Sequence, residues 1–251
     1  MMETWNVLNR ILKRREKGNA MRIVIWNCQD GFHKKVEALL SQNPDVAVVP
    51  ECREKSAAAL QQAGYEMVWV GPSPRKKGLG VFCRKGWSIR ALPLPRQEWI
   101  VPVEIDGPTS FTLLAVWACQ MGSKKAQRYI GLVYEALMSH PEWFGCRPVV
   151  LAGDLNSNKI WDRKREVGSH SDVVNILTER GLVSAYHEFF AEAQGAETRP
   201  TLHLHRYAHR PYHVDHIFIP REWMQRLKMV EVGAYDEWSK RSDHCPMTVD
   251  L

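Results

Sequence analysis

Short apolar runs recur along the chain, and helix-like segments separate the first of them. Arg22–Trp26 and Val46–Val49 have the β-branched content of buried strands, whereas Lys34–Gln42 and Lys55–Ala63 place apolar residues on one side of a helix. After these, strand-like runs follow one another across turns rich in Pro and Gly, which predicts antiparallel pairing. The further predicted strands are Glu66–Val70, Leu79–Cys83, Trp87–Ala91, Phe111–Trp117, Pro148–Ala152, His213–Ile219, Met229–Gly233 and Pro246–Leu251, and the further helices are Ala126–Ser139 and Ser171–Arg180. This order excludes a purely parallel doubly wound sheet and predicts an α/β (α+β) fold of packed mixed sheets with helices outside.

The length of the chain, 251 residues with 45% apolar content, suits one globular domain, which we place at residues 21–251. Residues 1–20 stand apart as a basic amphipathic extension, because Trp5, Leu8 and Leu12 fall at helical spacing before the basic run 13–15. The charges follow the apolar residues, which is the wrong order for a secretory signal. The extension is either dispensable or a contact for nucleic acid or a membrane surface.

The net charge of +6 favours an anionic partner such as nucleic acid or a phosphorylated small molecule. The six cysteines form no C-x-x-C pair, so buried, reduced thiols in a cytoplasmic protein are the favoured interpretation over a disulfide framework or a zinc site. No apolar run approaches the roughly 18 residues that a membrane span needs, so no stable membrane association is expected. We expect a monomer.

Polar residues stand at the ends of several predicted strands, where an α/β fold can gather them on one rim. Asn27 follows the first strand and Glu51 the second, and Asp154 and Asn156 follow Pro148–Ala152. A carboxylate such as Glu51 is a natural ligand for Mg²⁺, although it also suits the N-terminus of the next helix. An i, i+2 pair on an extended segment would direct Asp154 and Asn156 into one pocket, whereas a turn is the alternative.

A second group lies near the C-terminus, where Ser242, Asp243 and His244 precede the last strand. Asp215 sits within an apolar segment, where an unpaired carboxylate would be costly, so it needs a partner. We assign His244 to that role, because a carboxylate that accepts a hydrogen bond from imidazole orients the ring and favours its charged form. The neighbouring His216 alternates to the other face of the strand.

These segments together resemble the endonuclease/exonuclease/phosphatase superfamily, which includes deoxyribonuclease-like and abasic-endonuclease-like enzymes. The resemblance covers residues 21–251 and implies a four-layer αββα sandwich of two packed mixed β-sheets with the site at one edge. A single such motif is weak, but five in the same order are specific. They are Trp26-Asn27-Cys28, Pro50-Glu51-Cys52, Gly153-Asp154-Leu155-Asn156, Val214-Asp215-His216-Ile217 and Ser242-Asp243-His244-Cys245-Pro246.

The resemblance also implies a metal site. Glu51 resembles the principal ligand of Mg²⁺, for which Mn²⁺ could substitute, and Asn27 would contact metal-bound water or the phosphate. Asp243 would assist the metal or its waters. An additional acidic ligand after Asn27 is doubtful, because this chain has Gln29 and then Asp30 where some nucleases place an acidic residue two positions on.

The same resemblance implies catalytic roles. Asp154 resembles the residue that orients or deprotonates the attacking water, and Asn156 would hold a phosphate oxygen. His244 resembles the histidine that contacts the scissile phosphate, oriented by Asp215. Either Asp154 or His244 could be the general base, and we favour Asp154. Such a site would hydrolyse a phosphodiester by metal-assisted attack of water on phosphorus.

The substrate must be selected by the loops around this site. Many relatives have a histidine or tyrosine within the stretch where this chain reads 115–120, so Trp117 or Gln120 must replace or forgo that contact. Trp117 is therefore a candidate substrate contact, together with the basic residues Lys76 and Lys77. Aromatic and basic residues also alternate around Trp161 and in 203–213, which could suit unpaired bases. A nuclease acting on DNA or RNA is the favoured function. The alternatives are a phosphatase or phosphodiesterase for a small-molecule or phosphoinositide substrate, and a catalytically silent nucleic-acid-binding module.

Overall fold

The computed structural model describes residues 20–73, 76–93, 100–119, 129–145, 147–164 and 166–251. The predicted N-terminal extension therefore lies outside the described residues except for Ala20, and so does the start of the predicted helix Ala126–Ser139. Within these ranges no helix combines the length and the apolar content that crossing a lipid bilayer requires.

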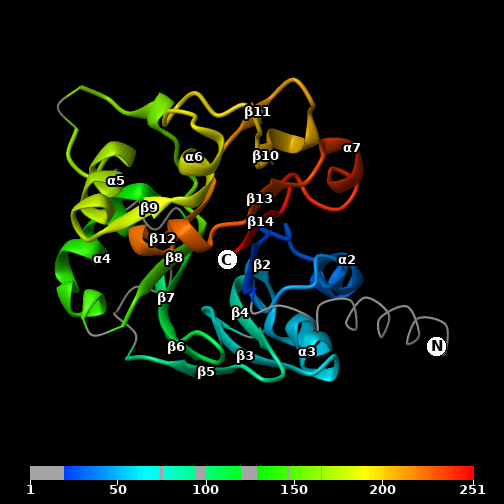
Figure 1. Cartoon of the computed structure of the whole chain (residues 1–251). Coiled ribbons are helices and arrows are strands. Elements are labelled where there is room, and N and C mark those ends of the chain that lie inside the picture. The colour runs from blue at the N-terminus through cyan, green and yellow to red at the C-terminus, as the bar shows by residue number, and fades with distance from the viewer. Residues whose placement is uncertain (1–19, 74–75, 94–99, 120–128, 146, 165) are drawn as a thin grey trace.

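Two six-stranded sheets form the centre of the described fold (Figure 1). Each sheet contains one parallel pair, β1 with β2 in the first and β7 with β8 in the second, and otherwise antiparallel neighbours. The first sheet runs in the order β13 (Met229–Val232), β14 (Met247–Asp250), β1 (Arg22–Ile25), β2 (Val46–Cys52), β4 (Gly78–Arg84) and β3 (Tyr65–Val70). The second runs in the order β5 (Ser88–Ala91), β6 (Ile100–Asp106), β7 (Phe111–Trp117), β8 (Val149–Asp154), β12 (Asp215–Pro220) and β9 (Leu182–Ser184). Both sheets are mixed, as the sequence predicts.

Helices cover the outer face of each sheet, which completes the four layers (Figure 1). The helices α2 (Val36–Ser41) and α3 (Glu54–Gln62) pack on the first sheet, and α4 (Ile130–Ser139) and α5 (His170–Glu179) pack on the second. The remaining elements are α6 (Ala185–Phe190), α7 (Tyr235–Trp238), a small hairpin of β10 (Leu202–His203) and β11 (Pro211–Tyr212), and the 3₁₀ helices η1 (Phe32–Lys34), η3 (Pro141–Phe144), η4 (Lys159–Trp161), η5 (Leu204–Arg206) and η6 (Arg221–Arg226).

Alternation along the strands divides the apolar residues into three layers. In β1, Ile23 and Ile25 face the second sheet, whereas Val24 packs with the outer helices. In β8, Val150 faces the first sheet and Leu151 packs with α4 and α5. Because both faces of each sheet are buried, the central strands read as continuous apolar runs rather than as an alternating pattern.

Several local predictions differ from the structure. The helix predicted over Lys34–Gln42 is divided at Lys35 into the 3₁₀ helix η1 and the helix α2. The strand β6, which carries Pro102, was not predicted, although it pairs with β7 from Ile100 to Ile105. The short β9 and helix α6 were also missed. None of these differences changes the predicted layers.

Candidate active site

Glu51 is positioned by an irregularity at the end of β2. The pairing of β2 with β4 shifts register between Pro50 and Cys52, and Glu51 there adopts a left-handed conformation with φ of 62°. Such a bulge redirects a side chain, and the conformation costs a residue with a Cβ about 1–3 kcal/mol. The Glu51 Oε1 atom accepts a hydrogen bond from Asn27 Nδ2 at 3.2 Å, and Oε2 forms an ion pair with Lys77 Nζ at 2.5 Å. Glu51 is therefore directed toward the end of β1 rather than toward α3.

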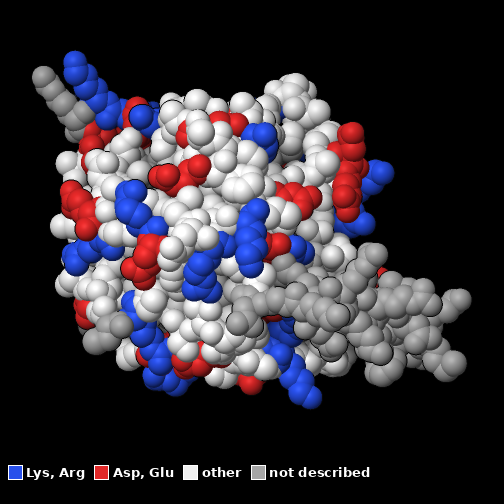
Figure 2. Space-filling model, viewed as in Figure 1, with Lys and Arg blue, Asp and Glu red and all other residues white. Residues whose placement is uncertain are grey.

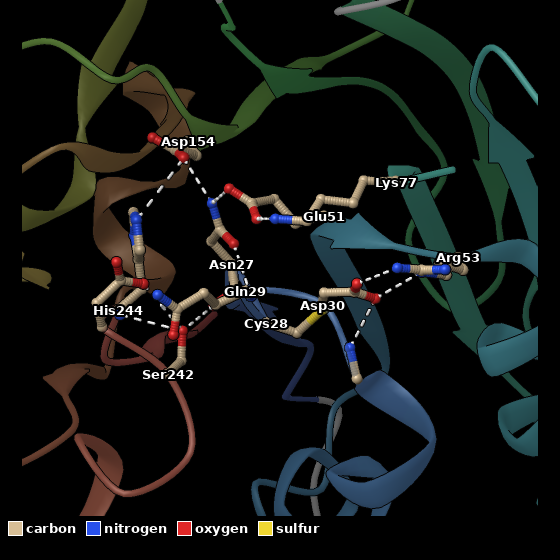
Figure 3. Close-up of polar contacts among 12 residues, drawn as sticks. Asn27, Cys28, Gln29, Asp30, Glu51, Arg53, Lys77, Asp154, Ser242 and His244 are labelled. Carbon is tan, nitrogen blue, oxygen red and sulfur yellow. Dashed lines mark hydrogen bonds and ion pairs between the residues drawn. The ribbon is translucent and has the colours of Figure 1, made fainter. Parts of the chain in front are cut away.

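Asn27 joins the two sheets at the site (Figure 3). It follows β1 directly and is buried. Its Nδ2 donates both to Glu51 and to Asp154 Oδ2, the latter at 2.9 Å, and its Oδ1 accepts from the backbone N–H of Gln29 at 3.0 Å. The carboxylate of the first sheet and that of the second are thus connected through one carboxamide.

Asp154 ends β8, and a tight turn follows it. Asp154 Oδ1 accepts the backbone N–H of Asn156 at 2.8 Å, and Asp154 Oδ2 accepts Asn156 Nδ2 at 3.0 Å. Asn156 has φ of 45°, so the extended conformation predicted for these two residues holds for Asp154 in β8 but not for Asn156. The two side chains nevertheless contact each other. Asn156 Nδ2 also donates to the carbonyl of Ala118 at 2.8 Å.

Gly153 allows β7 and β8 to approach closely beside Asp154. A Cβ at this position would lie 1.9 Å from the carbonyl oxygen of Val116, so only glycine fits. Trp117, at the end of β7, is paired in register with Asp154 and packs partly against the core between the sheets. Its role as a substrate contact stays a prediction.

The predicted pair of Asp215 and His244 is formed. Asp215 opens β12 opposite Asp154, and its Oδ2 accepts a hydrogen bond from His244 Nδ1 at 2.7 Å. His244 Nε2 lies 4.0 Å from Asp154 Oδ2. Ser242 fixes the approach of this segment, because its hydroxyl donates to the carbonyl of Asn27 at 2.8 Å and accepts the backbone N–H of His244 at 3.1 Å. Ser242 had no predicted role, although it forms part of the C-terminal motif.

The buried charges at the site shift two pKa values. Burial, followed by the charge of Asp215, raises the pKa of Asp154 to about 7. Burial opposes the charged form of His244, but the charges of Asp215 and Asp154 outweigh it and raise the pKa of His244 to about 10. Asp215 Oδ1 is buried and, among the described residues, has no hydrogen-bond partner. At neutral pH the site therefore holds a charged imidazole beside a carboxyl group that can exchange a proton.

Two places at the site have the donors for a metal ion. The ligand atoms of Asp154, Asp215 and His244 lie within 4.8 Å of one another, but a protonated imidazole repels a cation. The Glu51 carboxylate, partly open to solvent, offers oxygen donors with the Asn27 carboxamide beside it, which fits a hard cation such as Mg²⁺ or Mn²⁺. The Lys77 ammonium group already supplies positive charge at this carboxylate.

The other predicted site residues divide into near and distant ones. Asp243 is half-buried beside Ser242 and lies near enough for its charge to raise the pKa of His244. Lys76 is exposed, whereas Lys77 contacts Glu51. Asp30, whose contact with a metal was doubtful, pairs instead with Arg53 and accepts hydrogen bonds from its Nε and Nη2 atoms. The predictions that Lys76 and Lys77 bind substrate and that Asp243 assists the metal remain untested.

A cluster of buried histidines behind Asp215 was not predicted. His216 points away from the site, as expected, and its ring lies 5.0 Å from that of His213 and 5.1 Å from that of His170. Burial lowers the pKa of His213 to about 4 and that of His216 well below its ordinary value, so both rings are neutral. The only sequence signal was the spacing of His213 and His216 on either side of Asp215.

Comparison with known proteins supports the same family and fold. Residues 4–244 match the family model described as the Endonuclease/Exonuclease/phosphatase family. No curated protein sequence matches the chain. Similar solved structures include the 3′ phosphatase NExo from Neisseria bound to product DNA hairpin, with 22% identity, a TM-score of 0.68 and coverage of 91% of this chain and 98% of that one. The AP endonuclease LMAP from Leishmania major has 14% identity, a TM-score of 0.69 and coverage of 92% and 87%. An AP endonuclease from Archaeoglobus fulgidus has 16% identity, a TM-score of 0.68 and coverage of 91% and 98%.

Proposed function

Because the chain belongs to the Endonuclease/Exonuclease/phosphatase family, a family of hydrolytic phosphoesterases, we propose that it is a divalent-metal-dependent nuclease. One observation carries the proposal. Asn27 donates hydrogen bonds to both Glu51 and Asp154, which links the two carboxylates. On the other side of Asp154 lies His244, which is hydrogen-bonded to Asp215. An oxygen-donor site, a titratable carboxylate and a charged imidazole are the groups that hydrolysis of a phosphodiester requires.

Glu51 would hold the metal ion, with Asn27 beside it. When bound, Mg²⁺ or Mn²⁺ would neutralise charge on the phosphate and stabilise the departing oxygen. Lys77 would then exchange its contact with Glu51 for the phosphate of the substrate, because the ammonium group and the metal compete for the same carboxylate. Asp243 would add negative charge near the metal from the neighbouring segment.

Asp154 acts as the general base in this proposal. Its pKa of about 7 lets it take a proton from water near neutral pH, and the two carboxamides of Asn27 and Asn156 fix its Oδ2 atom. His244 remains charged because of Asp215, and its Nε2 atom is directed to the same space. The imidazolium would therefore bind a phosphate oxygen and stabilise the charge that builds up on it during attack.

Two observations favour nucleic acid as the substrate: the net positive charge of the chain and the DNA substrates of the similar proteins. The chain carries a net charge of +6, and the similar structures are those of a 3′ phosphatase bound to product DNA and of AP endonucleases. On the face shown in Figure 2, basic and acidic side chains are interspersed, so the positive charge is not collected into one patch there. The loops around the site would therefore make the contacts with the sugar and the bases.

The test compares substrates and metals with purified protein. Plasmid DNA, single-stranded DNA, RNA, an abasic duplex and a phosphoinositide panel are each incubated with Mg²⁺, Mn²⁺ or EDTA. We expect metal-dependent cleavage of nucleic acid that Glu51→Gln, Asp154→Ala and His244→Ala each abolish. Asp250→Asn is the matched control, because this buried carboxylate pairs with Arg22. Arg22 opens β1, whereas the site residue Asn27 follows the opposite end of that strand. Activity that persists in EDTA or in Asp154→Ala would contradict the mechanism, and hydrolysis of phosphoinositides alone would contradict the substrate.

A further inference from the structure

A pocket of about 590 Å³ opens directly beside Asn156. This volume falls in the range of small-molecule binding pockets, which is about 300–1,000 Å³. Besides Asn156, the wall includes residues from the loop that follows β8 and from the start of α5. They include Ser157, Trp161, Asp162, Arg163, Glu166 and Ser169. A group attached to a phosphate held beside Asn156 would therefore lie next to this pocket.

Trp161 gives the pocket a fixed aromatic wall. It belongs to η4, whose N-terminus Asn158 caps by accepting the backbone N–H of Ile160 at 3.0 Å. Asn158 is buried and also donates to the carbonyl of His213 at 2.9 Å, which fastens the loop to the segment before β12. The Trp161 ring lies 5.2 Å from the ring of Tyr212 and is still 45% exposed. A large apolar ring is thus held in place with much of its surface free for a ligand.

The backbone N–H groups at the start of α5 are already paired, so this helix end does not offer a site for a second phosphate. The N-terminus of α5 is a common anion site, but here acidic side chains already accept its backbone N–H groups. Asp162 accepts from His170 at 2.8 Å and from Ser171 at 3.0 Å. Asp172 accepts from Gly168 at 2.9 Å and from Ser169 at 3.0 Å. The wall also sets Arg163 against Asp162 and Glu166, so its charges are mixed in sign and the pocket suits a planar, uncharged group.

We propose that this pocket holds the nucleobase of a nucleotide next to the scissile phosphate, stacked on Trp161. The base edge would face the polar groups of the wall, which include the side chain of Ser157. A base inside a duplex is paired and stacked and would have to leave the helix to enter, which costs a few kcal/mol. The preferred substrate is therefore nucleic acid with an unpaired nucleotide at the cleavage point, such as a single strand or a frayed end. This inference rests on the proposed nuclease function.

The test is a double-mutant cycle between Trp161 and the base. Trp161→Ala and the wild type are compared on a single-stranded oligonucleotide and on the same oligonucleotide with the base removed from the nucleotide beside the cleaved bond. Stacking on an aromatic side chain contributes about 1–3 kcal/mol per base, so we expect Trp161→Ala to raise KM for the intact strand roughly 5- to 150-fold. On the strand that lacks the base we expect no further loss. Trp161→Phe should recover most of the affinity.

Phe189→Ala is the matched control, because Phe189 on α6 is 40% exposed and does not line the pocket. A loss in Trp161→Ala that is equal for both strands, or faster cleavage by the wild type once the base is absent, would overturn the proposal. Quenching of tryptophan fluorescence by a dinucleotide in EDTA provides a readout without catalysis. If the wild type cleaves no nucleic acid but the quenching is present and disappears in Trp161→Ala, the proposed function fails and the pocket stands. Absence of both coupling and quenching refutes the pocket.

Discussion

The Asp215→Asn substitution tests the electrostatic basis of the site. It preserves the shape of the side chain but removes the negative charge that lies 2.7 Å from His244 Nδ1. An amide in this place either donates to Nδ1 through nitrogen, which selects the opposite tautomer, or accepts through oxygen without a charge. Both groups are buried, so water does not replace the lost interaction.

The size of the effect follows from the pKa of His244. In the native site this pKa is raised from 6.5 to about 10, with Asp215 the largest contributor against burial and Asp154 the next. At about 1.4 kcal/mol for each pH unit, this corresponds to roughly 5 kcal/mol in favour of the charged form. Without Asp215 we expect His244 to lose its proton at neutral pH. The loss of a positioned proton-bearing group lowers kcat roughly 10²- to 10⁴-fold.

The assay combines kinetics with a titration. NMR of labelled histidine follows the His244 ring in the wild type and in Asp215→Asn, and kcat is measured across the same pH range. Because the folded pKa is raised, the pair stabilises the wild type fully below pH 6.5, and this contribution is lost as the pH rises through 10. Asp250→Asn should lower stability without changing kcat. A charged His244 in Asp215→Asn, or an unchanged kcat, would refute the reasoning.

Three further predictions concern the backbone, the buried histidines and the metal ligand. Gly153→Ala would place its Cβ 1.9 Å from a β7 carbonyl oxygen, so chemical denaturation should show that the free energy of unfolding falls by several kcal/mol, and activity should be lost. Gly181→Ala is the control, because its Cβ would have no atom within 4 Å, and it should cost only about 1 kcal/mol. Equal losses of stability in the two variants would contradict this prediction. Burial lowers the pKa of His213 to about 4, so the wild type should lose roughly 3 kcal/mol of its free energy of unfolding as the pH falls from 6.5 through 4. Urea unfolding of His213→Gln should show a shallower dependence of this free energy on pH. Lys77→Met removes the ammonium group from Glu51 and should tighten Mn²⁺ binding about fivefold, as measured by electron paramagnetic resonance; an unchanged Kd would show that the ion pair does not compete with the metal.

The order of the motifs predicted the site because each one ends or opens a strand. Strand ends are delivered to one rim by the sheet itself, so Asn27, Glu51 and Asp154 could be placed together from local patterns alone. The pairing of Asp215 with His244 followed from the cost of burying an unpaired carboxylate, and the structure confirms it.

Features set by tertiary packing could not be predicted in this way. The bulge at Glu51 depends on the register of β2 against β4, which no local pattern records. The left-handed turn at Asn156 and the contact of Lys77 with Glu51 depend equally on the assembled site. The strand β6 was missed because Pro102 interrupts its apolar run, yet the neighbouring strands hold it in the sheet.

The site is divided between the two sheets, and this has a mechanical consequence. Asn27 and Glu51 move with the first sheet and Asp154 and Asp215 with the second, and the hydrogen bond from Asn27 to Asp154 spans the joint. The thickness of the apolar layer between the sheets thus sets the distance from Glu51, the proposed metal ligand, to Asp154, the proposed general base. A core substitution far from the site, such as one that thins this layer by a methylene group, would misalign the two halves while the chain stays folded. Catalysis should consequently fail before the fold does as the protein is heated, since misplacement of reacting groups by about 1 Å already costs roughly 10²-fold in rate.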